Sequence, residues 1–188
     1  VNGGTLNISS GSLGVSPATA AGVLTVNGSG VNSIANIGSS ANIRFNNANL
    51  LIGNNATAAG AVFQTGTVTG VNQLQLGSIT GGSYGYYNLS GSAALTIAEL
   101  DCGGFNGAPT GVFDIAGGTL TNTSWFIVAR GSGGSSLLNL TGGTVNFTGT
   151  AANQFVMNFN ANATQSAVIN VANAGFYATN ATAGILNM

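Results

Sequence analysis

The chain has 188 residues, of which 44% are hydrophobic and only 3% are charged. Two arginines and three acidic residues give a net charge of −1, which cannot supply the phosphate contacts of a nucleic-acid-binding protein. No window approaches the roughly 20 consecutive apolar residues of a transmembrane helix, and a chain this apolar and this weakly charged is unlike a disordered one.

A triplet of apolar, polar and apolar residues recurs along the chain, with spacings of 18 to 31 residues. This alternation is typical of a β-strand with one buried face. In chain order, the triplets are Leu6–Ile8, Leu24–Val26, Ile43–Phe45, Phe63–Thr65, Tyr87–Leu89, Phe113–Ile115, Leu138–Leu140 and Ile169–Val171.

Glycine or asparagine stands three positions after the central residue in six of these eight copies. Both residue types adopt positive φ at low cost, so we expect the chain to turn a corner there. A second extended run follows the corner, as at Thr119–Thr121, and several copies hold a third, as at Phe126–Val128. The corner residues are Gly28, Asn47, Gly91, Gly117, Gly142 and Asn173.

Helix signals are nearly absent, whereas glycine and β-branched residues are frequent. Short strands, corners in place of hairpin turns, and this period predict an all-β fold, a single-stranded parallel β-helix (β-solenoid) of about eight coils of 18–31 residues. We expect one solenoid domain over residues 1–188, forming a fragment or processed part of a longer chain.

One coil cannot bury its own apolar residues, so each needs the same pattern above and below it. The apolar members of the triplets should therefore face inward in two columns, with the central polar residues outward. The first column is Leu6, Leu24, Ile43, Phe63, Tyr87, Phe113, Leu138 and Ile169. The second is Ile8, Val26, Phe45, Leu89, Ile115, Leu140 and Val171.

The stretch GVFDIAGGTLTNTSWFIVARGSGGSSLLNLTGGTVNFTG, from Gly111 to Gly149, resembles the autotransporter-associated β-strand repeats of bacteria. The match is good from about Tyr84 to Phe147 and loose elsewhere. The resemblance implies a right-handed parallel β-helix exported to the surface of a bacterium, as in adhesin-like passenger proteins. It brings no catalytic residues with it.

The chain has no histidine and no lysine, which removes the commonest general base and the lysine of a phosphate-binding loop. Glu99 and Asp101 lie two apart and so point to one side of a strand. With Asp114 they form either a carboxylate site for glycoside cleavage or calcium, or a solvated acidic patch. Aligning the turns makes Asp101 and Arg130 diagonal neighbours, an exposed pair contributing at most about 1 kcal/mol. We expect no catalytic or metal-binding residue, no cofactor and no enzymatic activity.

Tyr84, Tyr86 and Trp125 are candidate surface-contact residues, either stacking against sugars or covering an edge or interface. Arg44 occupies the outward position of its triplet, as a solvated or contact-making residue. Cys102 has no partner for an internal disulfide. It is either a packed or shielded thiol, or a functional one that forms an intermolecular disulfide or reacts as a thiol.

We therefore expect a structural extracellular protein, a β-helical segment of a bacterial surface fibre or adhesin stalk whose coils stack end to end. Its main partner would be further copies of itself, as a homo-oligomer or filament. The alternative is an adhesin module that binds a glycan or a host cell surface without self-assembly, and a carbohydrate-active enzyme is the third hypothesis.

Overall fold

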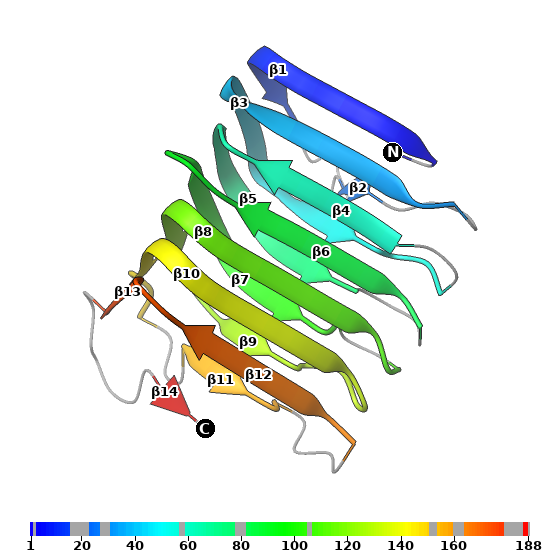
Figure 1. Ribbon diagram of the computed structural model, residues 1–188, viewed down its shortest axis with the longest axis vertical. Coiled ribbons are helices and arrows are strands. Elements are labelled where there is room, and N and C mark those ends of the chain that lie inside the picture. Colours follow the sequence, from blue (N-terminus) through cyan, green and yellow to red (C-terminus); the bar gives the residue numbers. More distant parts are fainter. Residues whose placement is uncertain are drawn as a thin grey trace.

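The computed structural model describes residues 1, 3–15, 23–26, 31–56, 59–77, 82–104, 107–150, 154–159, 164–178 and 186–187. Every regular element in these ranges is a β-strand, and every strand pair is parallel (Figure 1). No helix formed by these residues is long and apolar enough to span a membrane. The strands are β1 (Gly4–Gly14), β2 (Val23–Val26), β3 (Ser33–Ile52), β4 (Ala59–Gln64), β5 (Thr67–Leu76), β6 (Tyr84–Leu89), β7 (Ala94–Cys102), β8 (Thr110–Asn122), β9 (Phe126–Val128), β10 (Ser135–Phe147), β11 (Phe155–Met157), β12 (Ser166–Val171), β13 (Gly175–Ala178) and β14 (Leu186–Asn187).

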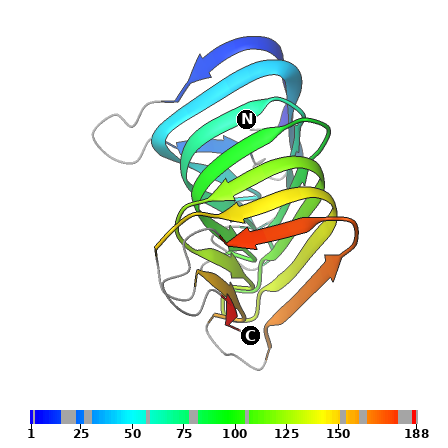
Figure 2. The same ribbon diagram turned by 90° about the vertical axis from the view of Figure 1, so that its left-hand side faces the viewer.

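The strands wind around a common core and stack on three faces (Figure 2). The first face holds β4, β6, β12 and the first halves of β1, β3, β8 and β10. The second holds β13, the middle of β3, the starts of β5 and β7, and the second halves of β1, β8 and β10. The third holds β2, β9, β11, β14 and the ends of β3, β5 and β7. The predicted all-β parallel solenoid is therefore confirmed.

The coils are fewer than the expected eight, because seven strands stack on the first face. Successive equivalent residues on that face are 25 to 31 positions apart. The first inward column runs Leu6, Ala35, Val62, Tyr87, Phe113, Leu138 and Ile169. The second runs Ile8, Ile37, Gln64, Leu89, Ile115, Leu140 and Val171.

Two of the expected triplets belong to other faces. Leu24 and Val26 pair with Leu50 and Ile52 on the third face. Ile43 pairs with Val68 on the second face, and Phe45 follows it there in the core. Placing these residues in the first-face columns was wrong, because the same alternation of apolar and polar residues recurs on all three faces. The first-face copy between Leu6 and Val62 is instead Ala35–Ile37.

Phe63 was also assigned to the wrong side of its strand. It is 41% exposed, while Val62 is 1% exposed and Gln64 is fully buried. A shift of one residue turns every side chain of a strand to the opposite face. Gln64 is accommodated because its polar atoms are satisfied: Tyr87 donates its hydroxyl to Gln64 Oε1, and Gln64 Nε2 donates to the carbonyls of Gly66 and Ala94 at 3.0 and 2.8 Å.

The inward columns are least covered at the two ends of the rod. Leu6, Ile8 and Ile169 are half-buried, and Val171, expected in the core, is 58% exposed. Phe113 and Leu138, in the middle of the first column, are fully buried. The difference arises because a terminal coil has a neighbouring coil on one side only.

The corners depend on residues with positive φ, as expected, but not at every expected position. Asn47, Gly91 and Asn173 have φ values of 69°, 63° and 57°. At the Gly117 and Gly142 corners, positive φ occurs instead at the following residues, Gly118 and Gly143. Gly28 lies outside the described residues.

Gly117 and Gly142 are required for close packing between coils. A Cβ atom on Gly117 would lie 2.9 Å from the backbone of Gly91, and one on Gly142 would lie 2.7 Å from the carbonyl oxygen of Ala116. Cβ atoms do not approach backbone atoms this closely, so no larger residue fits without a shift of one coil against the next. These two corners therefore bring neighbouring backbones together.

Gly91 and Gly118 allow these two roles of glycine to be separated. Both have positive φ, but a Cβ on Gly91 meets no atom within 4 Å, whereas one on Gly118 would lie 2.3 Å from the Ala93 carbonyl oxygen. Gly91→Ala should lower the free energy of unfolding by about 1–2 kcal/mol, the cost of a left-handed alanine. Gly118→Ala should cost about 3 kcal/mol or more, because a steric clash is added. Urea denaturation of both variants measures the difference, and equal losses would contradict the proposed close approach.

Candidate functional site

The three acidic residues lie on two different faces. Glu99 and Asp101 are on β7 in the third face, on the same side of the strand as expected. Asp114 is on β8 in the first face, paired with Asn88 and Asn139. The described residues contain no group of three or more His, Cys, Asp or Glu side chains able to hold a metal ion. The three-carboxylate arrangement considered from the sequence is therefore not formed.

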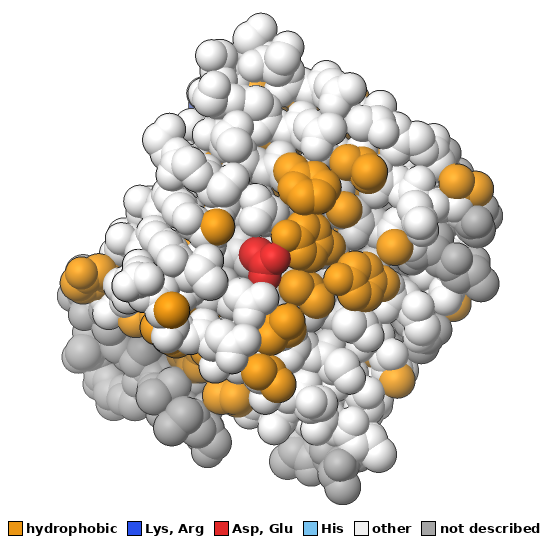
Figure 3. All heavy atoms as spheres, in the orientation of Figure 1, with side chains coloured by type: hydrophobic (Ala, Val, Ile, Leu, Met, Phe, Trp, Pro, Cys, Tyr) orange, Lys and Arg blue, Asp and Glu red, His pale blue; other side chains and the backbone are white. Residues whose placement is uncertain are grey.

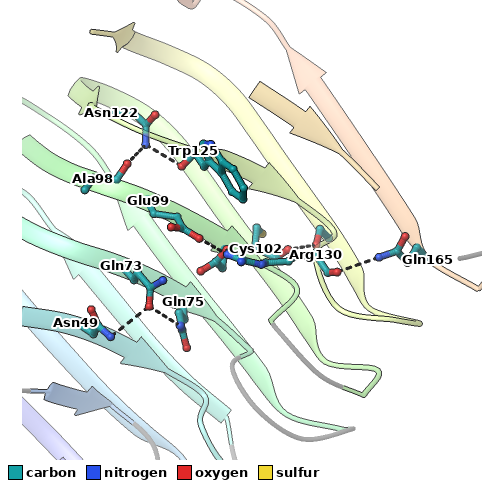
Figure 4. A network of polar contacts seen from close by, with 12 residues as sticks. Asn49, Gln73, Gln75, Ala98, Glu99, Cys102, Asn122, Trp125, Arg130 and Gln165 are labelled. Atoms are coloured by element: carbon teal, nitrogen blue, oxygen red, sulfur yellow. Dashed lines mark hydrogen bonds and ion pairs between the residues drawn. The ribbon is translucent and has the colours of Figure 1, made fainter. Parts of the chain in front are cut away.

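A buried ion cluster joins Glu99, Asp101 and Arg130, which we call the third-face cluster (Figure 4). Arg130 Nη1 donates to Glu99 Oε1 and to Asp101 Oδ1. The sequence correctly placed Asp101 next to Arg130, but the pair is not exposed. The side chain of Asp101 is inaccessible to solvent, and those of Arg130 and Glu99 are 15% and 18% exposed.

Two aromatic rings lie against the third-face cluster. The guanidinium carbon of Arg130 is 6.0 Å from the centre of the Trp125 ring and 5.5 Å from that of Phe159. The two rings are themselves 5.4 Å apart. Trp125, a candidate surface-contact residue, is half-buried in this packing. The cluster thus holds Arg130 by two carboxylates and two π faces, an environment suited to a planar cation.

The pKa of Asp101 is raised from 3.8 to about 8, first because burial disfavours the charged carboxylate and second because Glu99 is nearby. Arg130 opposes this shift by hydrogen bonding and charge. Asp101 Oδ2 is buried and accepts no hydrogen bond from the described residues. One Arg⁺ beside two carboxyl groups is neutral overall when one carboxyl holds a proton.

Polar side chains continue from Glu99 along the third face (Figure 4). Gln73 pairs with Glu99 in the strand register, and Asn49 stands next to Gln73 in the preceding coil. Asn49 Nδ2 and Gln75 Nε2 donate to Gln73 Oε1 at 3.3 and 3.1 Å. In the coils that precede Glu99, the equivalent outward positions are therefore occupied by uncharged amides and not by carboxylates.

Cys102 is fully buried on the inward side of β7. Burial raises the pKa of its thiol to about 12, and the nearby Asp101 adds to the shift against the opposing effect of Ser136. A thiol that is both inaccessible and protonated is a poor nucleophile. Its environment is that of a packed core side chain.

An outward row of side chains runs the length of the first face. Asn36 Nδ2 donates to Asn7 Oδ1 at 2.7 Å, and Asn170 Nδ2 donates to Asn139 Oδ1 at 2.8 Å. Asn139 in turn donates to Asp114 Oδ1 at 2.6 Å. The sequence indicated the outward positions of Asn7, Asp114, Asn139 and Asn170 but not that of Asn36, and the structure joins these side chains into ladders. In order, the row is Asn7, Asn36, Phe63, Asn88, Asp114, Asn139 and Asn170.

The row is interrupted by an aromatic patch formed by Phe63, Tyr84, Tyr86 and Asp114. The rings of Phe63 and Tyr86 are 5.5 Å apart, and Tyr86 donates its hydroxyl to Asp114 Oδ2 at 2.7 Å. Phe63 and Tyr84 are 41% and 39% exposed. Hydrophobic side chains gather around a single acidic group on this face (Figure 3). Sequence reasoning identified Tyr84 and Tyr86 but missed Phe63, because it assigned that residue to the core.

The tyrosines of the patch are held in their neutral form. The pKa of Tyr86 is raised to about 12 by burial, and the hydrogen bond to Asp114 adds to the shift. The pKa of Tyr84 is raised by burial and by the charge of Asp114. The patch therefore presents uncharged aromatic rings beside one carboxylate.

Both ends of the rod carry strands with one unpaired edge among the described residues. β1 pairs only with β3, and β2 also pairs only with β3. At the opposite end, β12 and β13 pair only with β10, and β14 pairs only with β11. Unpaired strand edges are sites where another strand adds by backbone hydrogen bonds.

No protein-family model matches the chain, and no curated protein and no solved structure matches it either.

The third-face cluster predicts a pH dependence of stability. A folded-state pKa of about 8 for Asp101 lies above the ordinary value of 3.8, so the folded chain keeps a proton that the unfolded chain releases. The stabilisation is complete below about pH 4 and decreases as the pH rises to about 8, with a slope of at most about 1.4 kcal/mol per pH unit. Asp101→Asn should flatten this part of the curve, whereas Asp114→Asn should leave it unchanged. Urea denaturation between pH 4 and pH 9 measures it, and an equal slope in the Asp101→Asn variant would refute the assignment.

Proposed function

We propose that this chain is a structural β-solenoid segment of a bacterial surface fibre or adhesin stalk, extended by end-to-end stacking of coils. The observation that carries the proposal is that β1 at one end and β12 at the other each have an edge that pairs with no other described strand. Because all strands are parallel, both edges present the same hydrogen-bonding geometry as the internal coils. A further coil, from a second copy or from the same chain, extends the rod without a change of architecture.

The apolar columns support stacking. Leu6 and Ile8 at one end, and Ile169 and Val171 at the other, are members of the same two columns. Each is only partly covered or exposed in the isolated rod. Placing one end on the other buries these side chains against their column equivalents, with a gain of about 25 cal/mol for each Å² of apolar surface removed from water.

The outward row supports the same arrangement. Asn7 and Asn170 are its two ends, and each already forms an amide hydrogen bond with the next coil inward. Stacking places Asn170 of one copy beside Asn7 of the next, where a further amide pair of the same kind forms.

The extracellular location rests on the resemblance of residues 84–147 to repeats of exported bacterial proteins. The low charge agrees with a fibre, since rods with few charges repel one another weakly. Charged residues number five in the entire chain, and three of them pair with one another in the third-face cluster. The purified chain should form filaments that persist on dilution and that show an axial repeat of about 4.8 Å, as seen by electron microscopy and fibre diffraction.

Charge substitutions at the two ends of the outward row test the stacking register. Asn7→Asp with Asn170→Asp places like charges at the junction and should shorten filaments at least about fivefold. Asn7→Asp with Asn170→Lys should restore their length, because the charges are then opposite. The hydrogen bonds to Asn36 and Asn139 are kept in this second variant, since an Asp accepts and a Lys donates.

The contrast between the two variants should disappear at about 1 M salt, where the Debye length is only about 3 Å. Circular dichroism of both variants checks that the coil itself stays folded. Dispersed short rods in the wild type at every concentration would refute self-stacking, and equal filament lengths in the two variants would refute the register.

A further inference from the structure

Of the five charged side chains of this chain, three form salt bridges with one another and two do not, among the described residues. Glu99, Asp101 and Arg130 form the third-face cluster. Arg44 and Asp114 remain, with opposite signs, and neither forms a salt bridge within the described residues. They lie on different faces, Arg44 on β3 in the second and Asp114 on β8 in the first. One chain therefore displays one cation and one anion at separate places on its surface.

Asp114 lies in an environment suited to a guanidinium group. Its two carboxylate oxygens accept hydrogen bonds from Tyr86 and Asn139, which fixes their orientation. The rings of Phe63, Tyr84 and Tyr86 lie on the same side of the sheet, and Phe63 and Tyr84 are well exposed. A carboxylate combines with aromatic faces to bind arginine through charge pairing and stacking together.

The same chain already uses this chemistry to hold an arginine. Arg130 is bound by the carboxylates of Glu99 and Asp101 and lies within 6.0 Å of the ring centres of Trp125 and Phe159. The aromatic patch repeats this combination of acid and rings on an exposed face. Its own chain provides no arginine there.

Arg44 stands exposed on an otherwise uncharged surface. Its neighbours across the strands are Gly14 on β1 and Thr69 on β5. Both neighbours are uncharged, so neither forms an ion pair with Arg44 and neither repels a charged group that approaches it. The guanidinium is therefore presented outward, at the end of a long side chain.

We propose that Arg44 of one copy binds the aromatic patch of a second copy, so that solenoids associate side by side. The proposal rests on the fibre function above and specifies how rods are held laterally. Because the two contact surfaces lie on different faces, the contact is heterologous and does not close after two copies. Each rod offers one free cation and one receiving patch, so rods add sideways into a ribbon or bundle.

Charge complementarity favours a second copy over a glycan as the occupant. A neutral sugar chain would use the exposed rings but would leave Arg44 without a role. A second copy uses both remaining charges of the molecule in a fixed one-to-one ratio. Contact between these faces also brings neutral Asn and Thr surfaces together, which adds no like-charge repulsion.

Charge reversal tests the contact. Arg44→Glu and Asp114→Arg should each weaken lateral association at least about tenfold, which corresponds to 1.4 kcal/mol. The double variant Arg44→Glu/Asp114→Arg should regain most of the loss, because the pair is restored with its signs exchanged. Sedimentation velocity at low salt measures association, and electron microscopy of the same samples gives bundle width separately from filament length.

Milder variants guard against misfolding. Asp114→Asn removes the charge and keeps an oxygen that accepts from Asn139, while its new amide N–H can donate to the Tyr86 hydroxyl in place of the bond that Tyr86 donated. Arg44→Gln removes the other charge. Both should narrow the bundles and abolish their dependence on salt without changing the thermal melting of the coil. Ser132→Glu, at an exposed turn, is the control for net charge and should leave bundle width unchanged.

The outcomes separate this proposal from the fibre function. Filaments of normal length whose width is the same in the wild type and the Arg44 and Asp114 variants would overturn lateral binding while leaving end-to-end stacking intact. Short rods that still pair through Arg44 and Asp114 would overturn end-to-end stacking while leaving lateral binding intact. Binding of cellohexaose that is lost in Tyr86→Ala but kept in Arg44→Gln, with no lateral association, would assign the patch to a glycan and overturn the proposal.

Discussion

The whole structure depends on one constraint, the parallel hydrogen-bonded register between each coil and the next. A residue in this register lies about 4.8 Å from its equivalents above and below. Tyr87 stacks between Val62 and Phe113, and an inward position in one coil is inward in all of them. The glycines at Gly117 and Gly142 keep neighbouring backbones close enough for this register, since a Cβ at either position would collide with the adjacent coil. The stability of each coil consequently depends on its contacts with the neighbouring coils.

The same constraint explains why the chain has so few charges. An outward side chain stands beside its equivalents in the adjacent coils, and a repeated charge would repel itself at each step. Asparagine has both a donor and an acceptor, so it can repeat, as Asn7 and Asn36 do. A carboxylate only accepts, so it needs donors from its neighbours. Asp114 receives them from Asn139 and Tyr86, and Glu99 and Asp101 receive theirs from Arg130.

The sequence was most informative where the repeat is regular. Around Phe113 and Leu138, the alternation, the glycine pair and the spacing agree, and the predicted first-face strands lie in register there. The assignment failed at Phe63, because Gln64 is buried through hydrogen bonds to groups that are remote in sequence. It also failed at Leu24 and Ile43, because alternation marks a strand without identifying its face.

The candidate sites were predictable to different extents, for similar reasons. Asp101 and Arg130 were recognised as neighbours because two turns could be aligned. The burial of Asp101 could not be predicted from the sequence, because it depends on packing across coils. Leu51 and Ile127, which share its outward line on the third face, are buried as well.

The asparagine ladders have a further consequence. On the first face, the amide hydrogen bonds of the ladders, from Asn36 to Asn7 and from Asn170 through Asn139 to Asp114, all point toward the amino-terminal coil. The side-chain dipoles of these two ladders therefore point the same way along the axis. The proposed head-to-tail growth would continue this direction, whereas a head-to-head junction would set donor against donor, so a fibre built in this way would have a single direction along its whole length.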